Sequence, residues 1–103
     1  MNFSPDPLAG QCMQSVALRR QVDTIVKQDI SEAYRLAKSI VHPWYRCQAL
    51  ATVADNSTGA SIRAILQESY DSAMDCHDPN RRVSVACWPM NCAQEQLTSL
   101  NFA

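Results

Sequence analysis

The chain has 103 residues, of which 47% are hydrophobic and 18% charged, a composition that favours one folded domain and argues against intrinsic disorder. Its formal net charge of −1 disfavours a dedicated nucleic-acid-binding protein and a polybasic membrane anchor, because both depend on an excess of Lys and Arg. The sequence has no apolar run near the ~18–20 residues that cross a bilayer, and its start does not resemble a secretory signal.

The cysteines are odd in number and mostly occupy positions where a small apolar residue fits. Free, partly buried thiols of this kind are typical of a reducing compartment, where disulfides do not persist. We therefore expect a cytoplasmic protein with free thiols. The five cysteines are Cys12, Cys47, Cys76, Cys87 and Cys92.

Three dipeptides that can start helices recur at intervals of 36 residues: Asp6–Pro7, His42–Pro43 and Asp78–Pro79. Pro is favoured at the first helical position, where its missing N–H is not needed, and Asp just before it can cap the exposed amides. His42 takes the place of the two capping Asp residues. We therefore expect a helix to begin at each of these three steps.

Apolar residues follow a helical period along most of the chain, and no stretch alternates with the period of two that is typical of strands. Residues 55–59 contain turn-forming residues and should form a loop, and Pro89 should end or kink the last strong helix. The segment 91–103 should be a tail or a short helix. The sequence predicts helices near residues 6–20, 24–41, 43–54, 60–76 and 79–88.

The segments 25–60 and 61–96 agree at several positions when they are aligned, and residues 7–20 match the second helix of the same unit. A helix pair of about 36 residues that cannot bury its own apolar face must stack on a neighbouring pair. The alignment therefore predicts an internal repeat. Its identities are Glu32 with Glu68, Tyr34 with Tyr70, Ala37 with Ala73, Pro43 with Pro79, and Arg46 with Arg82.

The predicted fold is a single all-α domain of about five helices, built as a short α-α helical repeat. The helices should form either a solenoid-like array or a compact bundle. The expected parts are a half unit over 6–20, one unit over 24–55, a second unit over 60–90, and the C-terminal tail or short helix over 91–103.

Two stretches resemble known helical repeats. "ESYDSAMDCHDPN" at 68–80 resembles the second helix and exit of a tetratricopeptide repeat, and "DPNRRVSVA" at 78–86 is similar to the Asp-Pro…Arg-Val step of HEAT repeats. The first-helix Trp, Leu-Gly and Tyr pattern of the tetratricopeptide repeat is missing, and the period is 36 rather than about 34 residues. The resemblance implies a stacked α-α fold and, by analogy, a protein-binding role.

A metal or catalytic site has some of the right residues but not the right pattern. Cys76, His77, Cys87 and Cys92 carry zinc-binding atoms, yet the sequence has no Cys-x₂-Cys pair, and we expect neither a metal nor a cofactor. Cys–His pairs such as Cys47 with His42 lack an identifiable orienting group, so we assign no catalytic residue. A small enzyme or enzyme subunit using Cys76, His77 and Asp78 remains the alternative.

The sequence "HPWY" at 42–45 places Trp44 and Tyr45 at the start of a helix, where the aligned residues of the next unit are polar. Such aromatics either form an exposed binding edge or cover the junction between neighbouring helices. The expected partner-binding residues are Trp44, Tyr45, Arg46, Arg81 and Arg82.

The function that these features favour is a protein–protein interaction or adaptor module without catalytic activity. We expect a protein or peptide partner, an acidic one in preference, and no membrane partner. A nucleic-acid-binding helical repeat is a further alternative, which the charge balance disfavours. A homodimer through an end face is also consistent with the sequence, because the ends of a helical array require polar caps.

Overall fold

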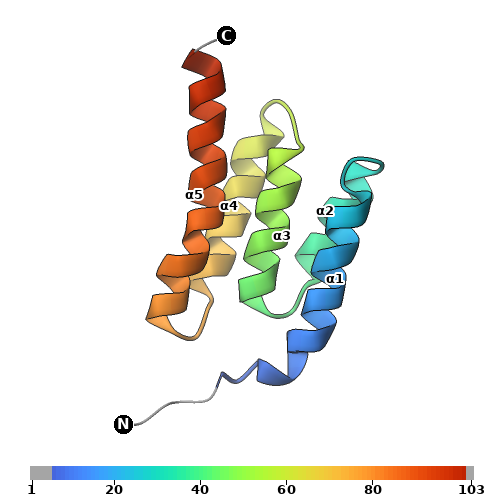
Figure 1. Ribbon diagram of the computed structural model, residues 1–103, viewed down its shortest axis with the longest axis vertical. Helices are drawn as coiled ribbons and strands as arrows, with labels where there is room; N and C mark the ends of the chain where they lie inside the picture. Colours follow the sequence, from blue (N-terminus) through green and yellow to red (C-terminus); the bar gives the residue numbers. More distant parts are fainter. Residues whose placement is uncertain (1–5, 102–103) are drawn as a thin grey trace.

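The computed structural model describes residues 6–101 of the chain and the side chains of residues 6–95. Within this range a short 3₁₀ helix, η1, precedes five α-helices, and no strand occurs (Figure 1). The predicted all-α class is therefore confirmed. The elements are η1 (Ala9–Gln11), α1 (Cys12–Ile25), α2 (Ile30–Ser39), α3 (Pro43–Asp55), α4 (Ser61–Met74) and α5 (Pro79–Asn101).

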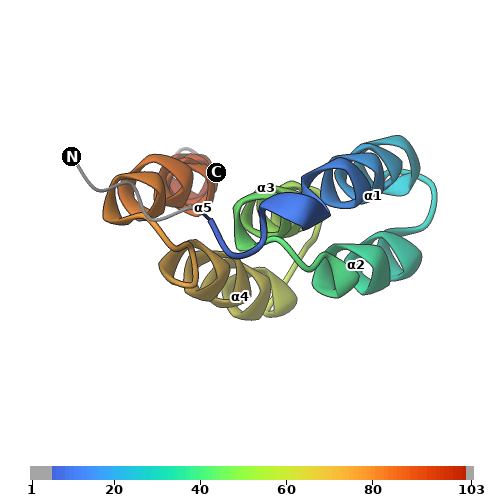
Figure 2. The same cartoon turned by 90° about the horizontal axis from the view of Figure 1, so that it is seen from below.

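The α-helices form two layers, with α1, α3 and α5 side by side in one layer and α2 and α4 in the other (Figure 2). Helix α2 packs against both α1 and α3, and α4 packs against both α3 and α5. The described part of the chain is a flat, elongated slab whose principal extents are 51 × 26 × 17 Å. Each helix of the smaller layer thus lies over the seam between two helices of the larger one.

The same kind of capping hydrogen bond occurs at each of the three predicted helix starts. At each, the side chain before the proline accepts a hydrogen bond from the backbone N–H two residues later, which satisfies a donor that the helix itself cannot. Helices α3 and α5 begin at their prolines, whereas Pro7 lies in a turn and α1 begins only at Cys12. The bonds run from Leu8 N–H to Asp6 Oδ1 (2.9 Å), from Trp44 N–H to His42 Nδ1 (3.2 Å) and from Asn80 N–H to Asp78 Oδ1 (2.7 Å).

The predicted helix over 24–41 is wrong at its start, because a turn over 26–28 separates α1 from α2. Asp29 caps α2, since its Oδ1 accepts the Glu32 N–H at 3.0 Å. An Asp followed three residues later by Glu is a sequence signal for a helix start, so this boundary is marked in the sequence itself. The apolar residues between 22 and 40 therefore belong to two helices that face each other.

Helix α5 does not end at Pro89 but continues through it and through the segment predicted as a separate tail or short helix. Of the segment 91–103, residues 102–103 lie outside the described residues. Pro89 has no N–H, so the carbonyl of Val85 loses its helical donor. The thiol of Cys47 on α3 donates to that carbonyl, with an Sγ–O distance of 3.5 Å. The Cys47 side chain thus replaces the backbone donor that is missing at Pro89.

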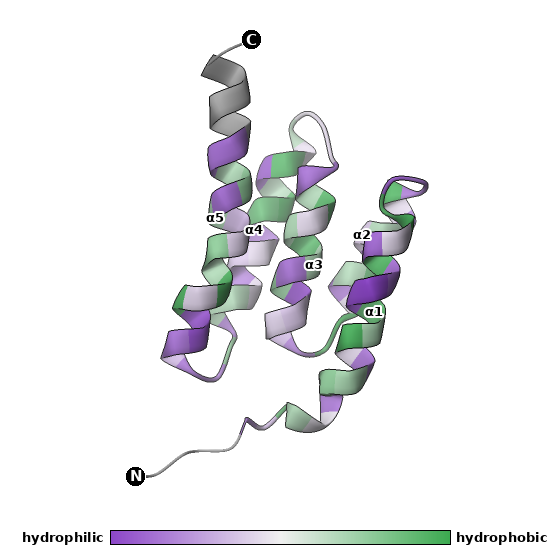
Figure 3. Cartoon of the chain, viewed as in Figure 1, coloured by the Kyte–Doolittle hydropathy of each residue, from purple (hydrophilic) through white to green (hydrophobic). Residues whose placement is uncertain are grey.

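The core is made of two clusters of buried residues. Hydrophobic residues are concentrated along the C-terminal half of α3 and the start of α4 (Figure 3). The first core cluster contains Val22, Val26, Ala33, Ala37, Ile40, Ala49, Leu50, Val53, Ala54, Ile65 and Cys92, and the second contains Cys47, Ala73, Cys76, Val85 and Ala86.

Several residues that are 36 positions apart make the same contacts. Arg46 donates to the carbonyl of Ile40 at 3.1 Å, and Arg82 donates to the carbonyl of Cys76 at 2.7 Å. The acceptor residues Ile40 and Cys76 are themselves buried, with 1% and 2% of their surface exposed. The two arginines therefore close equivalent connections, one between α2 and α3 and the other between α4 and α5.

Candidate functional site

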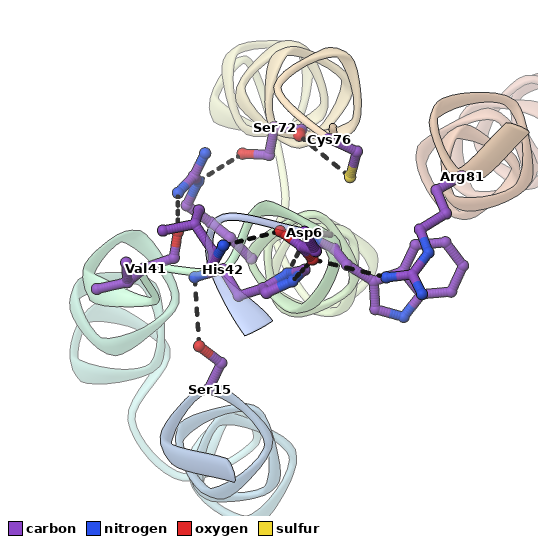
Figure 4. A network of polar contacts seen from close by, with 10 residues as sticks. Asp6, Ser15, Val41, His42, Ser72, Cys76 and Arg81 are labelled. Atoms are coloured by element: carbon purple, nitrogen blue, oxygen red, sulfur yellow. Dashed lines mark hydrogen bonds and ion pairs between the residues drawn. The ribbon is translucent and has the colours of Figure 1, made fainter. Parts of the chain in front are cut away.

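A polar cluster lies where the capping residues of successive helices meet (Figure 4). The imidazole of His42 is only 3% exposed, and its Nε2 lies 2.7 Å from Asp6 Oδ2. Because Nδ1 accepts a hydrogen bond from the Trp44 N–H, the ring proton is on Nε2, which donates a hydrogen bond to Asp6 Oδ2. The backbone N–H of His42 donates to Ser15 Oγ on α1 at 3.2 Å. This cluster ties the N-terminal segment and α1 to the start of α3.

Asp6 is the acidic member of the cluster and accepts from two neighbours. The backbone hydrogen bond from Leu8 lowers the pKa of the Asp6 carboxyl below its usual value of 3.8. The His42 hydrogen bond and the nearby Arg81 guanidinium, 3.7 Å away, act in the same direction against the effect of burial. The carboxylate is therefore ionised at neutral pH and is held by two hydrogen bonds and by an ion pair with Arg81.

Trp44 and Tyr45, two of the predicted partner-binding residues, contribute to the packing between helices. Trp44 is partly buried against the second core cluster, and the Arg81 guanidinium lies 5.8 Å from its ring centroid. Tyr45 packs against the first core cluster, with its ring 5.3 Å from that of His42. Of the two interpretations of Trp44, the structure therefore favours the covered junction.

Arg46 makes four hydrogen bonds that join the α2–α3 connection to α4. It donates to the backbone carbonyls of Ile40 and Val41, to Ser72 Oγ at 2.9 Å and to Asp75 Oδ2 at 3.1 Å. These bonds satisfy two backbone carbonyls just after the end of α2 and tie this connection to α4. The guanidinium of Arg46 is thus occupied within the chain.

The arginines on α5 differ in their surroundings. Arg82 donates to the carbonyl of Cys76, whereas the side chain of Arg81 is 54% exposed beside Asp6 and Trp44. The structure therefore brings Trp44 and Arg81 together and places Tyr45, Arg46 and Arg82 in separate contacts.

The thiols considered as nucleophiles have other partners. Burial raises the pKa of Cys47 to about 11, and it also raises the pKa of Cys76. Both ring nitrogens of His42 are bound to Asp6 and Trp44, so this imidazole does not pair with Cys47. A thiol with so high a pKa is almost wholly protonated at neutral pH and reacts slowly.

The residues considered as metal ligands are dispersed. Within the described range, no three His, Cys, Asp or Glu side chains lie close enough together to hold a metal ion. Cys92 lies near Asp55, with 3.8 Å between Sγ and Oδ1, and burial raises its pKa to about 11. Cys87 is exposed on α5, and Asp78 is committed to its capping bond.

An apolar groove of about 820 Å³ lies between α4 and α5 and is here called the α4–α5 groove. Its surface residues include large apolar side chains, since Tyr70 is 42% and Met90 61% exposed. Arg63 adds a positive charge, and Gln67 is held at the rim by a bond to Asp71. The groove is lined by Gly59, Ala60, Ile62, Arg63, Leu66, Gln67, Tyr70, Pro89, Met90 and Ala93.

The α5 side of this region corresponds to a surface that α4 covers elsewhere in the same chain. Val83 and Met90 are 72% and 61% exposed, whereas Cys47 and Ala54, which lie 36 positions earlier on α3, are fully buried. The groove is not among the features that the sequence analysis predicts. The signal for it is that α5 carries the apolar residues Val83 and Met90 at positions equivalent to buried residues of α3.

No protein-family model, curated protein or solved structure matches the chain. The candidate site therefore rests on the geometry described above. Over the described residues, none of the helices has the length and hydrophobicity needed to cross a membrane.

Proposed function

We propose that the chain is a protein-interaction module without catalytic activity, and that its α4–α5 groove binds a helix of a partner protein. The observation that carries this proposal is the position of the groove. It lies beside α5 and α4 where a further helix of the smaller layer would continue the alternation of the two layers (Figure 2). A partner helix in the groove would complete the array.

The packing inside the chain supports this arrangement. Helix α4 covers α3 by burying Ser69 and Ala73 against it, and both residues have no exposed surface. A partner helix with small residues at the same spacing would cover Val83 and Met90 in the same way. Burial of such apolar side chains contributes about 1.5–3 kcal/mol each when it is complete, which favours binding and offsets part of the cost of association. The resemblance to tetratricopeptide and HEAT repeats points to the same class of function.

The thiols support two further parts of the proposal, the absence of catalytic activity and a cytoplasmic location. Cys47, Cys76 and Cys92 are buried with raised pKa values, which fits packing better than nucleophilic catalysis. All five cysteines are free, which fits a reducing, cytoplasmic environment.

A peptide with the sequence of α4 tests the proposal, because α4 is the chain's own example of a helix in this kind of position. Residues 61–75 are synthesised with blocked ends and added to the full-length ¹⁵N-labelled protein. We expect amide shifts among the residues that line the α4–α5 groove. Met90→Glu places a charge in the groove and should weaken binding at least about tenfold.

The matched control is Met13→Glu, because Met13 is 88% exposed on α1 and lies outside the groove. This variant should bind the peptide as the unmodified protein does. If the peptide causes no shifts in the groove at millimolar concentration, the proposed function is wrong.

A further inference from the structure

One polar contact crosses between the two helices of the smaller layer. The hydroxyl of Tyr34 on α2 donates to Glu68 on α4, with distances of 2.7 and 2.6 Å to the two carboxylate oxygens. The interaction raises the pKa of Tyr34 to about 12, because ionising the phenol would break the hydrogen bond beside a negative charge. Tyr34 therefore serves as a hydroxyl donor to an acidic residue on the next helix.

Tyr70 stands in the same position one unit later. It follows Tyr34 by 36 residues on the aligned helix, and it lines the α4–α5 groove with 42% of its surface exposed. In the described part of the structure, the Tyr34 hydroxyl donates to Glu68, whereas the Tyr70 hydroxyl makes no hydrogen bond to its own chain. Its hydroxyl is thus placed to meet whatever helix enters the groove.

The surroundings of Tyr70 suit an anion. Arg63 is the charged residue among those that line the groove, and it precedes Tyr70 by seven residues, about two turns on the same helix. A carboxylate beside Tyr70 would gain a charge-assisted hydrogen bond from the phenol, which is stronger than the bond that a neutral acceptor makes. A basic side chain at that position would offer the hydroxyl no acceptor.

We infer that the partner helix carries an acidic residue whose carboxylate accepts the Tyr70 hydroxyl, followed directly by a small residue and by a second small residue four positions later. This inference rests on the proposed function and specifies the chemistry of its ligand. The pattern is that of α4, in which Glu68 precedes the buried residues Ser69 and Ala73. Ser69 Oγ also donates to the Cys47 carbonyl at 2.7 Å, which shows how closely a small residue allows the two helices to approach.

A second copy of the chain does not supply such a helix. In every copy α4 is already packed between α3 and α5, and both oxygens of Glu68 accept from Tyr34. Inserting that helix into another groove would require the first one to come apart. The fitting occupant is a different protein that presents an acidic helix with small residues.

The test is a double-mutant cycle that uses the full-length protein and the peptide of residues 61–75. Tyr70→Phe removes the hydroxyl and keeps the ring, and Glu68→Gln in the peptide removes the charge and keeps the shape. We expect Tyr70→Phe to weaken binding of the Glu68 peptide about three- to tenfold and to weaken binding of the Glu68→Gln peptide by a smaller factor, because the Gln amide oxygen still accepts a hydrogen bond but carries no charge. Tyr45→Phe, which removes a hydroxyl outside the groove, should affect neither peptide.

The outcomes separate this inference from the proposed function. Equal binding of both peptides to both proteins overturns the acidic-residue inference and leaves the groove as a helix-binding site. If neither peptide binds, the groove itself has been assigned wrongly. A concentration-dependent dimer that Met90→Glu abolishes in sedimentation experiments would show that a second copy is the occupant, which also overturns the inference.

Discussion

His42 shows how one side chain can combine two structural roles. It caps α3 through Nδ1, as Asp6 and Asp78 cap the segments at their equivalent positions, and its Nε2 donates to Asp6 itself. The sequence predicts the first role, because the proline after His42 marks a helix start. It does not predict the second, since the approach of Asp6 to His42 depends on how α1 packs against α3.

The Asp6 carboxylate should make stability depend on pH. Its pKa is lowered in the folded chain, so its contribution to stability is present above its usual value of 3.8 and is lost as the pH falls through the lower, folded value. Asp6→Asn keeps a capping oxygen for Leu8 and removes the charge. We expect the variant to lose about 1 kcal/mol of unfolding free energy at pH 7.

Thermal unfolding followed by circular dichroism between pH 2 and 7 measures this effect. The difference in stability between the unmodified protein and Asp6→Asn should shrink as the pH falls below about 4. A difference that stays constant over the whole range would show that the carboxylate charge does not stabilise the fold.

At the scale of single elements, two helix boundaries differ from those that the sequence predicts, one for a local and the other for a tertiary reason. The α1–α2 turn lies within a continuous apolar period, so the period alone joins the two helices, although Asp29 and Glu32 mark the boundary. Helix α5 runs through Pro89 because its continuation is decided by packing against α3 and α4. Such packing is a tertiary effect that a local propensity does not contain.

Pro89 should weaken α5, because it leaves the Val85 carbonyl to a thiol at 3.5 Å, a longer and weaker bond than a backbone hydrogen bond. Pro89→Ala restores the N–H and should raise the free energy of unfolding by about 1 kcal/mol, measured by urea unfolding at neutral pH. Ala64→Pro, which introduces proline into the middle of α4, should have the opposite effect. A loss of stability in Pro89→Ala would mean that the ring contributes more by packing than it costs in hydrogen bonding.

At the scale of the whole molecule, the sequence predicts the all-α class and the starts of two of its helices. The spacing of Pro43 and Pro79 places the starts of α3 and α5 correctly, and α3 and α4 fall where apolar residues follow a helical period. The predicted partner-binding residues Arg46 and Arg82 also donate to carbonyl groups of their own chain, which the sequence does not predict. Their partners lie in the connections between helices, whose geometry is set only when the helices have packed.

One side of α5 leaves large apolar side chains exposed to solvent. Helix α5 is the last of its layer and extends beyond the ends of α3 and α4 (Figure 1). It is covered by α4 on one side only, so Val83 and Met90 face solvent where their counterparts on α3 are buried. We propose that this uncovered side of α5, together with α4, binds a helix of a partner protein.

The most direct test places a nitroxide label on the peptide of residues 61–75 and records the paramagnetic broadening of amide signals in the full-length protein. We predict that the broadening is strongest around Tyr70 and Met90 and negligible around Met13. Broadening centred on α1 and α2, or spread evenly over the surface, would contradict the account.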